Sequence, residues 1–522
     1  MNTGEFLTIT SAICPDKEAI VFEGKRFTYS QLNERSNRLG NALLTLGLKK
    51  GNPVAMMQVN TNHCVESYFA VAKAGGIYVP LNFRAKGSEL TYMINTAEAT
   101  TVLVGDRYLD LIESIKSSIP TVKNFISLDK PHPGMLYYED LIKKSSPDEV
   151  VRDISDGDTT ILMYTAGTTG FPKGVMLTHN SFSIYVLENV TPADPETDEK
   201  NILTVPLYHV AGTQAMMAAI YGGRTLVMQR QFEAKQWMDL VEQERVSRAM
   251  MVPTMLKLLM DNPEFSKHDL SSLKVITYGA APMPLDIIKK AVDVFPGVGF
   301  INAFGQTETA STVTMLSPED HVITGTPEQR EKKLKRLSSI GKPMSDIEMK
   351  VVDEDGKDLP PNEIGEIIAR GPRVMAGYWK DQEKTKKTID KNGWVHTGDM
   401  GYRDEEGYYF LSGRTTDMIK RGGELISPEE VEHVLQEHPK VDDIAVVGVP
   451  DEEWGEVPIC VCVLKKGETC TASELMEYCR ANLASYKRPR AVVFCDELPR
   501  NQMGKVLKKN LRDQYKDVKP AA

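Results

Sequence analysis

The first 130 residues alternate between two patterns of hydrophobic positions, one with the period of a helix and one typical of buried strands. From Thr28 to Gly47 apolar side chains recur on one helical face, and Thr28 and Gln31 have the capping-box spacing. Short apolar runs, VAMMQV, GIYVPLN and TVLVGD, are typical of strands, and helical patterns separate them. This order, with short connections, predicts βαβ units and a parallel sheet covered by helices.

The same alternation returns between about residues 200 and 305, in NILTVPL, GGRTLVMQ, SRAMMVP, LKVITYGAA and GFINAFG. After about residue 340, short alternating runs separated by turn residues predict an antiparallel, β-rich subdomain. A further unit follows a linker at residues 411–417, and its first helix is predicted to begin at Ser427 with Pro428 in the first turn. The predicted fold class is α/β, with a large N-terminal domain of parallel-rich sheets covered by helices plus this β-rich subdomain, and a small α+β C-terminal domain.

Composition narrows the possible partners. A chain of 522 residues is too long for one core, and 41% hydrophobic and 26% charged residues are typical of a globular protein. The net charge of −10 argues against nucleic acid or a membrane surface as a partner of the whole chain. The segment 487–519 is rich in Lys and Arg, and it is either a contact for a polyanion or a solvated surface of mixed charge.

The cysteines and the termini give no sign of a metal site or of export. Seven cysteines lack metal-ligand spacing, and Cys460 and Cys462 alternate on one face of a predicted buried strand. The N-terminus lacks a secretory signal pattern, and no apolar run approaches the roughly 18 residues of a membrane span. We therefore predict a cytoplasmic protein without a membrane span.

The stretch YTAGTTGFPKGVMLTH, residues 164–179, is too polar for a core strand and concentrates small and hydroxyl residues around Lys173. Glycines there can adopt positive φ and let backbone N–H groups approach an anion. It is not a Walker loop, because Gly174 follows the lysine. On this evidence the stretch is either a surface turn or a cradle for the phosphates of a nucleotide.

The same stretch resembles the phosphate-loop signature of the adenylate-forming enzymes, which comprise acyl- and aryl-CoA synthetases, stand-alone adenylation domains and luciferases. Five later segments resemble further motifs of this family, in family order: YGAAP from Tyr278, FGQTE from Phe304, WVHTGD from Trp394, SGRTTDMIKRGGELISPEEVE from Ser412 and NQMGKVLKKNLR from Asn501. The resemblance spans about residues 16–512 and is closest to AMP-forming acyl-CoA synthetases.

The resemblance implies the reaction and the residues that carry it. ATP and a carboxylate would give an acyl-AMP and pyrophosphate, and CoA would then accept the acyl group, with Mg²⁺ as cofactor. The implied catalytic residues are Lys505, Thr307, Lys420 and Glu308, the last as the magnesium-linked acid. The implied ATP-binding residues are Thr165, Gly167, Thr168, Thr169, Gly170, Lys173, Gly279, Ala280, Ala281, Pro282, Phe304, Gly305 and, for the ribose, Asp399 with Arg414.

The family also implies that the small domain is mobile and rotates after adenylation. We expect a large ATP- and acyl-binding domain at residues 1–413 and a small domain at 414–522 that carries Lys505, with a hinge near Thr416. The family usually has Asp or Lys at this hinge, so the effect of threonine there is open. Rotation would bring Lys420 and the glycines that follow it into the site.

The acid and its acceptor are less constrained. By resemblance, TVPLYHVAGTQAMMAAIYGG lines the acyl pocket, with His209 as its gate, and Ala211, Gly212 and Ala303 complete the expected substrate pocket. No Asp or Glu lies between residues 201 and 224 to pair with a substrate ammonium group, which favours an apolar aromatic, alicyclic or medium-chain acid. CoA is the expected acceptor, with Lys487 and Arg488 as candidates for its phosphates. The alternative is an adenylation enzyme that loads a separate carrier protein, and the oligomeric state is left open.

Overall fold

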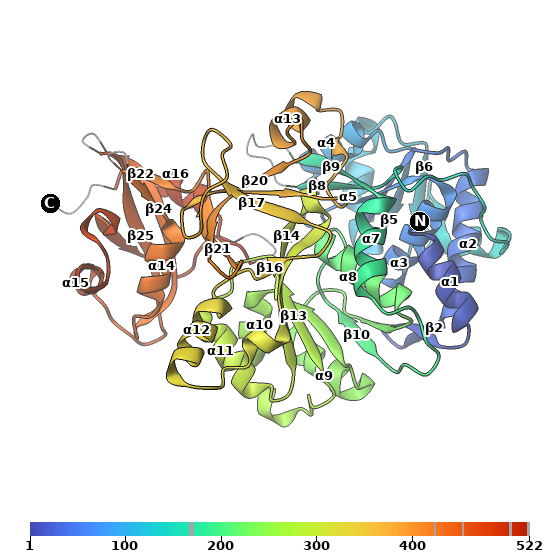
Figure 1. Cartoon of the computed structure of the whole chain (residues 1–522). Helices are drawn as coiled ribbons and strands as arrows, with labels where there is room; N and C mark the ends of the chain where they lie inside the picture. Colours follow the sequence, from blue (N-terminus) through green and yellow to red (C-terminus); the bar gives the residue numbers. More distant parts are fainter. Residues whose placement is uncertain (166–171, 422–423, 452–453, 501–503, 519–522) are drawn as a thin grey trace.

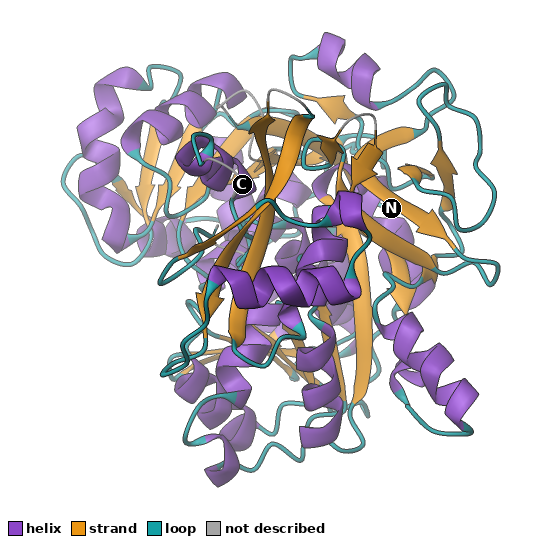
Figure 2. Cartoon of the chain, turned by 90° about the vertical axis from the view of Figure 1, so that its left-hand side faces the viewer, coloured by secondary structure: helices purple, strands orange, loops and turns teal. Residues whose placement is uncertain are grey.

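The computed structural model describes residues 1–165, 172–421, 424–451, 454–500 and 504–518. Within these ranges two parallel-rich sheets and an antiparallel sheet form the large domain, and a further sheet forms the small one. Figure 1 shows the small domain at the side of the molecule opposite the N-terminus, and Figure 2 shows helices packed around the strands. The predicted α/β fold class is confirmed.

The first sheet of the large domain follows the order β16 to β2, and its central strands, β14 to β1 in that order, run parallel. Antiparallel partners flank them on both sides. In sheet order the strands are β16 (Lys342–Pro343), β15 (Ser311–Leu316), β14 (Gly299–Gln306), β13 (Val275–Gly279), β12 (Arg248–Met251), β10 (Lys200–Leu203), β11 (Thr225–Met228), β1 (Glu18–Phe22) and β2 (Lys25–Thr28).

The second sheet contains the strands predicted near the N-terminus, and its strands from β8 to β7 run parallel. In sheet order its strands are β19 (Gly377–Tyr378), β9 (Lys173–Thr178), β8 (Thr159–Thr165), β4 (Ile77–Pro80), β3 (Pro53–Met57), β5 (Thr101–Val104), β6 (Asn124–Ser127) and β7 (Leu136–Tyr137). The view that residues 164–179 are too polar for a core strand is wrong for part of the stretch. Val175 and Leu177 are buried on β9, which pairs antiparallel with β8.

The helices of the large domain pack against these sheets, and the helix predicted to be capped by Thr28 begins there. The Thr28 side chain accepts from the Gln31 backbone N–H, and the Gln31 side chain accepts from the Thr28 N–H, which confirms the capping box. The α-helices are α1 (Glu5–Ile13), α2 (Tyr29–Thr45), α3 (Asn62–Ala74), α4 (Gly87–Ala97), α5 (Leu109–Ile115), α6 (Tyr138–Lys144), α7 (His179–Asn189), α8 (Val210–Tyr221), α9 (Ala234–Glu244), α10 (Pro253–Met260), α11 (Leu285–Val294), α12 (Pro327–Leu337) and α13 (Gln382–Thr388).

The predicted antiparallel subdomain is also present. Its sheet has the order β17 (Glu348–Val352), β18 (Gly365–Arg370), β20 (Val395–Arg403) and β21 (Tyr409–Arg414). Elsewhere along the chain, the described residues form the short 3-10 helices η1 (Asp106–Tyr108), η2 (Lys116–Ser118), η3 (Phe265–Lys267), η4 (Thr307–Thr309), η5 (Pro318–His321) and η6 (Ser485–Lys487). No helix in the described ranges has the length and apolar character needed to cross a membrane.

The small domain packs helices against a sheet of short and long strands. The Ser427 side chain accepts from the Glu430 N–H at the predicted helix start, and Cys460 and Cys462 are buried in one core cluster as expected. The elements are β22 (Ile419–Arg421), β23 (Glu424–Ile426), α14 (Pro428–Gln436), β24 (Val441–Asp451), β25 (Gly455–Leu464), α15 (Ala472–Asn482), β26 (Ala491–Phe494) and α16 (Lys508–Tyr515). The division at residues 413 and 414 and the hinge stay predictions.

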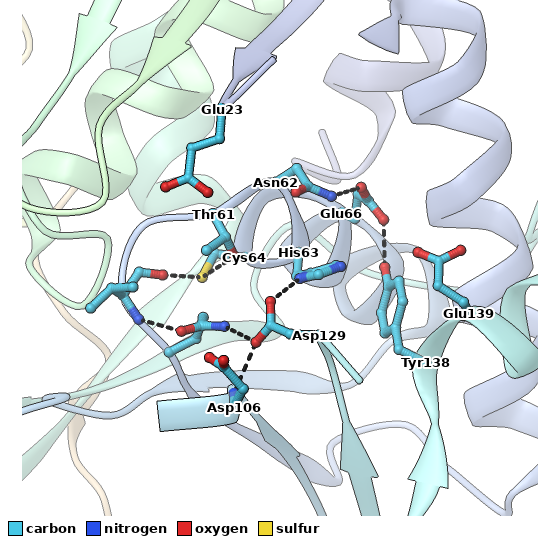
Figure 3. A network of polar contacts seen from close by, with 12 residues as sticks. Glu23, Thr61, Asn62, His63, Cys64, Glu66, Asp106, Asp129, Tyr138 and Glu139 are labelled. Carbon is cyan, nitrogen blue, oxygen red and sulfur yellow. Dashed lines mark hydrogen bonds and ion pairs between the residues drawn. The ribbon is translucent and has the colours of Figure 1, made fainter. Parts of the chain in front are cut away.

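A polar network binds the carboxyl ends of β3, β5 and β6 to α3 (Figure 3). The Asp129 carboxylate accepts from the Gln58 side chain at 2.9 Å and from the Asp106 N–H at 2.9 Å. On the neighbouring side, the fully buried Glu66 accepts from the Tyr138 hydroxyl at 2.6 Å. Because a buried charge without partners is costly, these contacts fix α3 against α6.

We expect Tyr138→Phe to lower the free energy of unfolding by about 2 kcal/mol, because it removes a hydrogen bond to the buried Glu66 carboxylate. Urea denaturation of the variant and the parent protein measures the change. Tyr137→Phe is the matched control, since the Tyr137 hydroxyl has no hydrogen bond within the described residues. Equal denaturation midpoints for Tyr138→Phe and the parent would contradict this account of the network.

Candidate active site

The predicted adenine segment leaves the carboxyl edge of the first sheet in a tight turn. Gly279 ends β13 opposite Ala303 on β14, and a Cβ at Gly279 would lie 2.1 Å from the Ala303 carbonyl oxygen. Ala280 then adopts a φ of 65°, which turns the chain away from the sheet before Ala281 and Pro282. Ligands of parallel sheets bind outside the carboxyl ends of the strands, which is where this segment lies.

The FGQTE segment continues β14 into the short helix η4. Gly305 is required by close packing, since a Cβ there would lie 1.5 Å from the Ser311 carbonyl oxygen. Thr307 and Glu308 follow at the start of η4. The Glu308 carboxylate accepts a hydrogen bond of 2.8 Å from the Tyr378 hydroxyl, which holds it beside the edge of the second sheet, where β19 pairs with β9.

Lys173 begins β9 and pairs in register with Thr165, the last residue of β8. Its ammonium group lies 5.4 Å from the centroid of the Tyr378 ring, so it shares this aromatic side chain with Glu308. Burial, and next the neighbouring Lys384 ammonium, lower the pKa of Lys173 to about 8. The predicted phosphate-loop residues Gly167, Thr168, Thr169 and Gly170 lie outside the described residues.

Asp399 and Arg414 face each other across β20 and β21, where the register pairs them. Arg414 Nε lies 2.7 Å from Asp399 Oδ1, and the aspartate is only 5% exposed. Burial raises the pKa of Asp399 to about 6, while Arg414 and Lys505 act in the opposite direction. Oδ2 is buried and has no hydrogen-bond partner in the described part of the chain, so it is an available acceptor.

Lys505 reaches this pair from the small domain. The preceding residue, Gly504, adopts a φ of 74°, and a Cβ there would lie 2.5 Å from the hydroxyl of Thr254 on α10 of the large domain. Burial, followed by the charge of Arg414, lowers the pKa of Lys505, and Asp399 opposes this. The two domains therefore meet at the predicted catalytic residues, and an ion pair of 2.9 Å between Lys257 and Asp442 joins them nearby.

Three of the expected acyl residues, His209, Ala211 and Gly212, lie at the N-terminal end of α8, and the fourth, Ala303, lies on β14. His209 precedes the helix, its Nε2 is buried without a hydrogen-bond partner among the described residues, and burial lowers its pKa to about 4. Ala211 is buried, and Gly212 packs closely enough that a Cβ would lie 2.5 Å from the Pro206 carbonyl oxygen. Ala303 lies on β14, at the nucleotide side of the site.

Lys420 is not brought to this site. It is exposed on β22 of the small domain, and its backbone N–H donates to Glu456. Within the described ranges its side chain contacts none of the other predicted catalytic residues. The structure thus joins Asp399, Arg414 and Lys505 at the domain interface and leaves Lys420 outside.

The structure also adds residues that sequence reasoning missed. Tyr378 positions Glu308 and packs beside Lys173, and Lys384 lies on the helix that follows it. The GYWK segment that contains Tyr378 was the available sequence signal. It resembles an ordinary aromatic turn, and it lies 70 residues after Glu308, so nothing in the sequence connects the two residues. Glu429 was missed as well, although one of its carboxylate oxygens is buried without a partner among the described residues.

Two domains bring acidic and basic groups together at the carboxyl edge of a parallel sheet, which is where enzymes with such sheets bind their ligands. The chain belongs to the AMP-binding enzyme family: the AMP-binding enzyme model matches residues 9–379, and the model of the C-terminal domain of these enzymes matches residues 430–505. The family predicted from the sequence motifs is confirmed.

Relatives and solved structures cover almost the whole chain. An indoleacetate–CoA ligase of Aromatoleum aromaticum is 34% identical over 98% of both chains. A fatty acid–[acyl-carrier-protein] ligase of Streptomyces coeruleorubidus is 32% identical over 96% of this chain and 94% of its own. The crystal structure of an anthranilate CoA ligase in complex with anthranoyl-AMP has a TM-score of 0.89 and 29% sequence identity, and the match covers 99% of this chain and 97% of the other.

We expect ATP binding to weaken on both sides of a window between about pH 6 and pH 8. As the pH falls through about 6, Asp399 becomes protonated and loses its charge, and as the pH rises through about 8, Lys173 loses its proton. Calorimetric titration with ATP from pH 5 to pH 9.5 measures both limbs.

Two variants show which residue causes each limb of the pH dependence of ATP binding. Lys173→Arg should remove the alkaline limb, because a guanidinium stays protonated, and Asp399→Asn should remove the acid limb. Limbs that persist unchanged in these variants would contradict the assignment.

Proposed function

We propose that this chain is an AMP-forming, ATP-dependent carboxylate–CoA ligase. It activates an apolar carboxylic acid (aromatic, alicyclic or medium-chain) as an acyl-AMP with release of pyrophosphate, and it then transfers the acyl group to CoA. The observation that carries this proposal is the meeting of Asp399, Arg414 and Lys505 at the domain interface. A cytoplasmic location stays a prediction from the sequence.

In the proposed first step, an oxygen of the substrate carboxylate attacks the α-phosphorus of ATP. The bond from this phosphorus to the oxygen of the β-phosphate breaks, and pyrophosphate leaves. The reactants are both anions, so catalysis needs positive charge and fixed positions. Lys505 supplies positive charge to the substrate carboxylate and the α-phosphate, and Lys173 supplies it to the leaving phosphates. The Asp399 carboxylate accepts hydrogen bonds from the ribose hydroxyls.

Glu308 would hold Mg²⁺ against the phosphates. The donor set fits this ion, because Mg²⁺ in nucleotide sites takes one or two carboxylates and fills its remaining positions with phosphate oxygens and water. Tyr378 fixes the carboxylate through a 2.8 Å hydrogen bond to Oε1. When bound, the ion supplies neutralisation of phosphate charge, and Thr307 adds a hydroxyl beside it.

The acyl pocket is proposed to accept an uncharged group. His209 is neutral at physiological pH because burial lowers its pKa to about 4, and its ring packs 4.3 Å from the Tyr208 ring, centroid to centroid. Ala211 and Gly212 are small residues in the first turn of α8, which leaves space beside the helix for the acyl group. A neutral aromatic wall without a carboxylate favours aromatic or aliphatic acids over amino acids.

For the second step, the residues proposed to bind CoA differ from those expected from the sequence. Lys487 forms a 2.6 Å ion pair with Glu430, and Arg488 donates to the backbone oxygens of Leu483 and Arg480, so neither is a good candidate for the CoA phosphates. Trp454 is a better candidate for the nucleotide part of CoA. It is 37% exposed, and the guanidinium of Arg421 lies 5.2 Å from its ring centroid.

The rotation of the small domain is part of the proposal. Its hinge lies near Thr416, whose carbonyl oxygen accepts from Arg512 at 2.7 Å, and rotation would replace Lys505 in the site by Lys420. The thiol of CoA would then lose its proton to solvent and attack the acyl carbon, and AMP would leave as the bond between that carbon and the phosphate oxygen breaks.

A carrier protein is the alternative acceptor, and the Streptomyces relative named above is a ligase of that kind. The deciding experiment measures AMP formed from ATP and Mg²⁺ with a panel of acids, with and without CoA. The panel contains acetate, medium-chain acids, benzoate, and cyclohexane- and cyclohexenecarboxylate. We expect turnover to AMP only with CoA and one class of acid.

Lys505→Ala is the control variant for that experiment, and it should lower AMP formation by about 100- to 1,000-fold. AMP formation that requires an acid but is unchanged by CoA would favour a carrier protein as the acyl acceptor. Formation of ADP, or no AMP with any acid, would overturn the proposed function.

We expect Trp454→Ala to raise the KM for CoA by about tenfold and to leave acid-dependent ATP–pyrophosphate exchange unchanged, because loss of a stacking ring affects the second substrate alone. Steady-state thioester formation and the exchange assay measure the two halves. Tyr486→Ala offers a comparison, since Tyr486 is equally exposed and its backbone oxygen, not its ring, binds Arg421. An unchanged KM for CoA in Trp454→Ala would contradict this assignment.

A further inference from the structure

Two lysine ammonium groups from different elements lie over one aromatic ring. The Nζ atom of Lys173, at the start of β9, is 5.4 Å from the centroid of the Tyr378 ring, and that of Lys384, on α13, is 5.7 Å from it. The hydroxyl of the same ring is bonded to Glu308. The two cations therefore lie next to the carboxylate that is proposed to hold Mg²⁺.

The local structure fixes Lys384 in this place. Strand β19 pairs with β9, so that Tyr378 lies opposite Val175, two residues from Lys173. The Tyr378 N–H then donates to the Thr385 hydroxyl at 2.9 Å, which ties the first turn of α13 to the same strand. As a result Lys384 is half-buried against the ring, whereas Lys386 on the same helix is exposed.

Among the described residues, carboxylates act on these ammonium groups only from beyond ion-pair distance, as Glu308 and Asp381 do on Lys173. In the described part of the chain, neither Lys173 nor Lys384 forms a salt bridge, whereas Lys73, Lys487 and Lys508 do. Two like charges at close range repel, and the cost increases where water is partly excluded. A pair of cations kept together in this way is suited to a ligand with several negative charges.

Resting on the proposed function, we propose that Lys384 is a second phosphate-binding residue, which acts with Lys173 as a two-cation clamp for the β- and γ-phosphates of ATP. The same clamp binds the pyrophosphate that leaves. A lysine is suited to this role because its ammonium group offers three donors and a compact charge to phosphate oxygens. AMP, which lacks both outer phosphates, has no contact with it.

The test compares Lys384→Gln with Lys386→Gln, which removes the same charge from an exposed position of the same helix. Calorimetric titrations at pH 7 use MgATP, inorganic pyrophosphate and AMP as ligands. We expect Lys384→Gln to raise the Kd for MgATP and for pyrophosphate by about tenfold and to leave the Kd for AMP unchanged. Lys386→Gln should bind all three as the parent does, and Lys384→Arg should retain most of the affinity.

The alternatives give different results. If Lys384 merely repels Lys173, its removal will leave the MgATP affinity equal or higher, and this would overturn the clamp. An equal loss of affinity for AMP and ATP would also overturn it, because it would indicate damage to the site as a whole, which a thermal melt of the variant would confirm. Failure of the parent protein to bind MgATP would instead count against the proposed function.

Discussion

The site depends on the compensation of one buried charge. Asp399 is almost fully enclosed, and a carboxylate in that position would be costly without opposite charge. Arg414 provides one compensating charge from the adjacent strand, and Lys505 provides another from the other domain. The electrostatics of the nucleotide site therefore depend on the position of the small domain, because Lys505 reaches Asp399 only when the domains are in this arrangement.

A second set of buried charges holds the segment that carries Lys505. Lys508, three residues further on, lies 3.2 Å from Glu429 and 2.9 Å from Glu432, and both acids project from α14. Arg512 on the same helix forms an ion pair with Asp417 and donates to Thr416 at the expected hinge. The catalytic lysine is thus bound to α14 on one side and to the hinge on the other, so movement at the hinge would carry the whole segment.

The sequence predicted the class of fold and the main site because both depend on local patterns. The strands from residues 53 to 104, the capped helix at Thr28 and the helix start at Ser427 follow from periodicity and capping, which are properties of neighbouring residues. Tyr378 and Lys384 could not be predicted in this way, because their importance comes from a strand pairing between β19 and β9 that joins distant parts of the chain. The ion pair of Lys487 with Glu430 also depends on tertiary structure, and it removes Lys487 from the residues expected, from charge alone, to bind CoA.

Several polar atoms at the site lack the partners that a protein interior normally supplies. Asp399 Oδ2, His209 Nε2 and Glu429 Oε2 are buried without hydrogen bonds among the described residues, which is uncommon for buried polar groups. They lie at the proposed ribose position, at the acyl pocket and beside Lys505, so each marks a surface where substrate or domain movement can supply the missing contact. The fold is consequently less stable at these points than it could be, and ligands that bind the folded state alone recover that stability in proportion to their affinity. Substrate binding therefore stabilises the domain interface as well, because the ribose contact falls on Asp399, the residue that Lys505 of the small domain compensates.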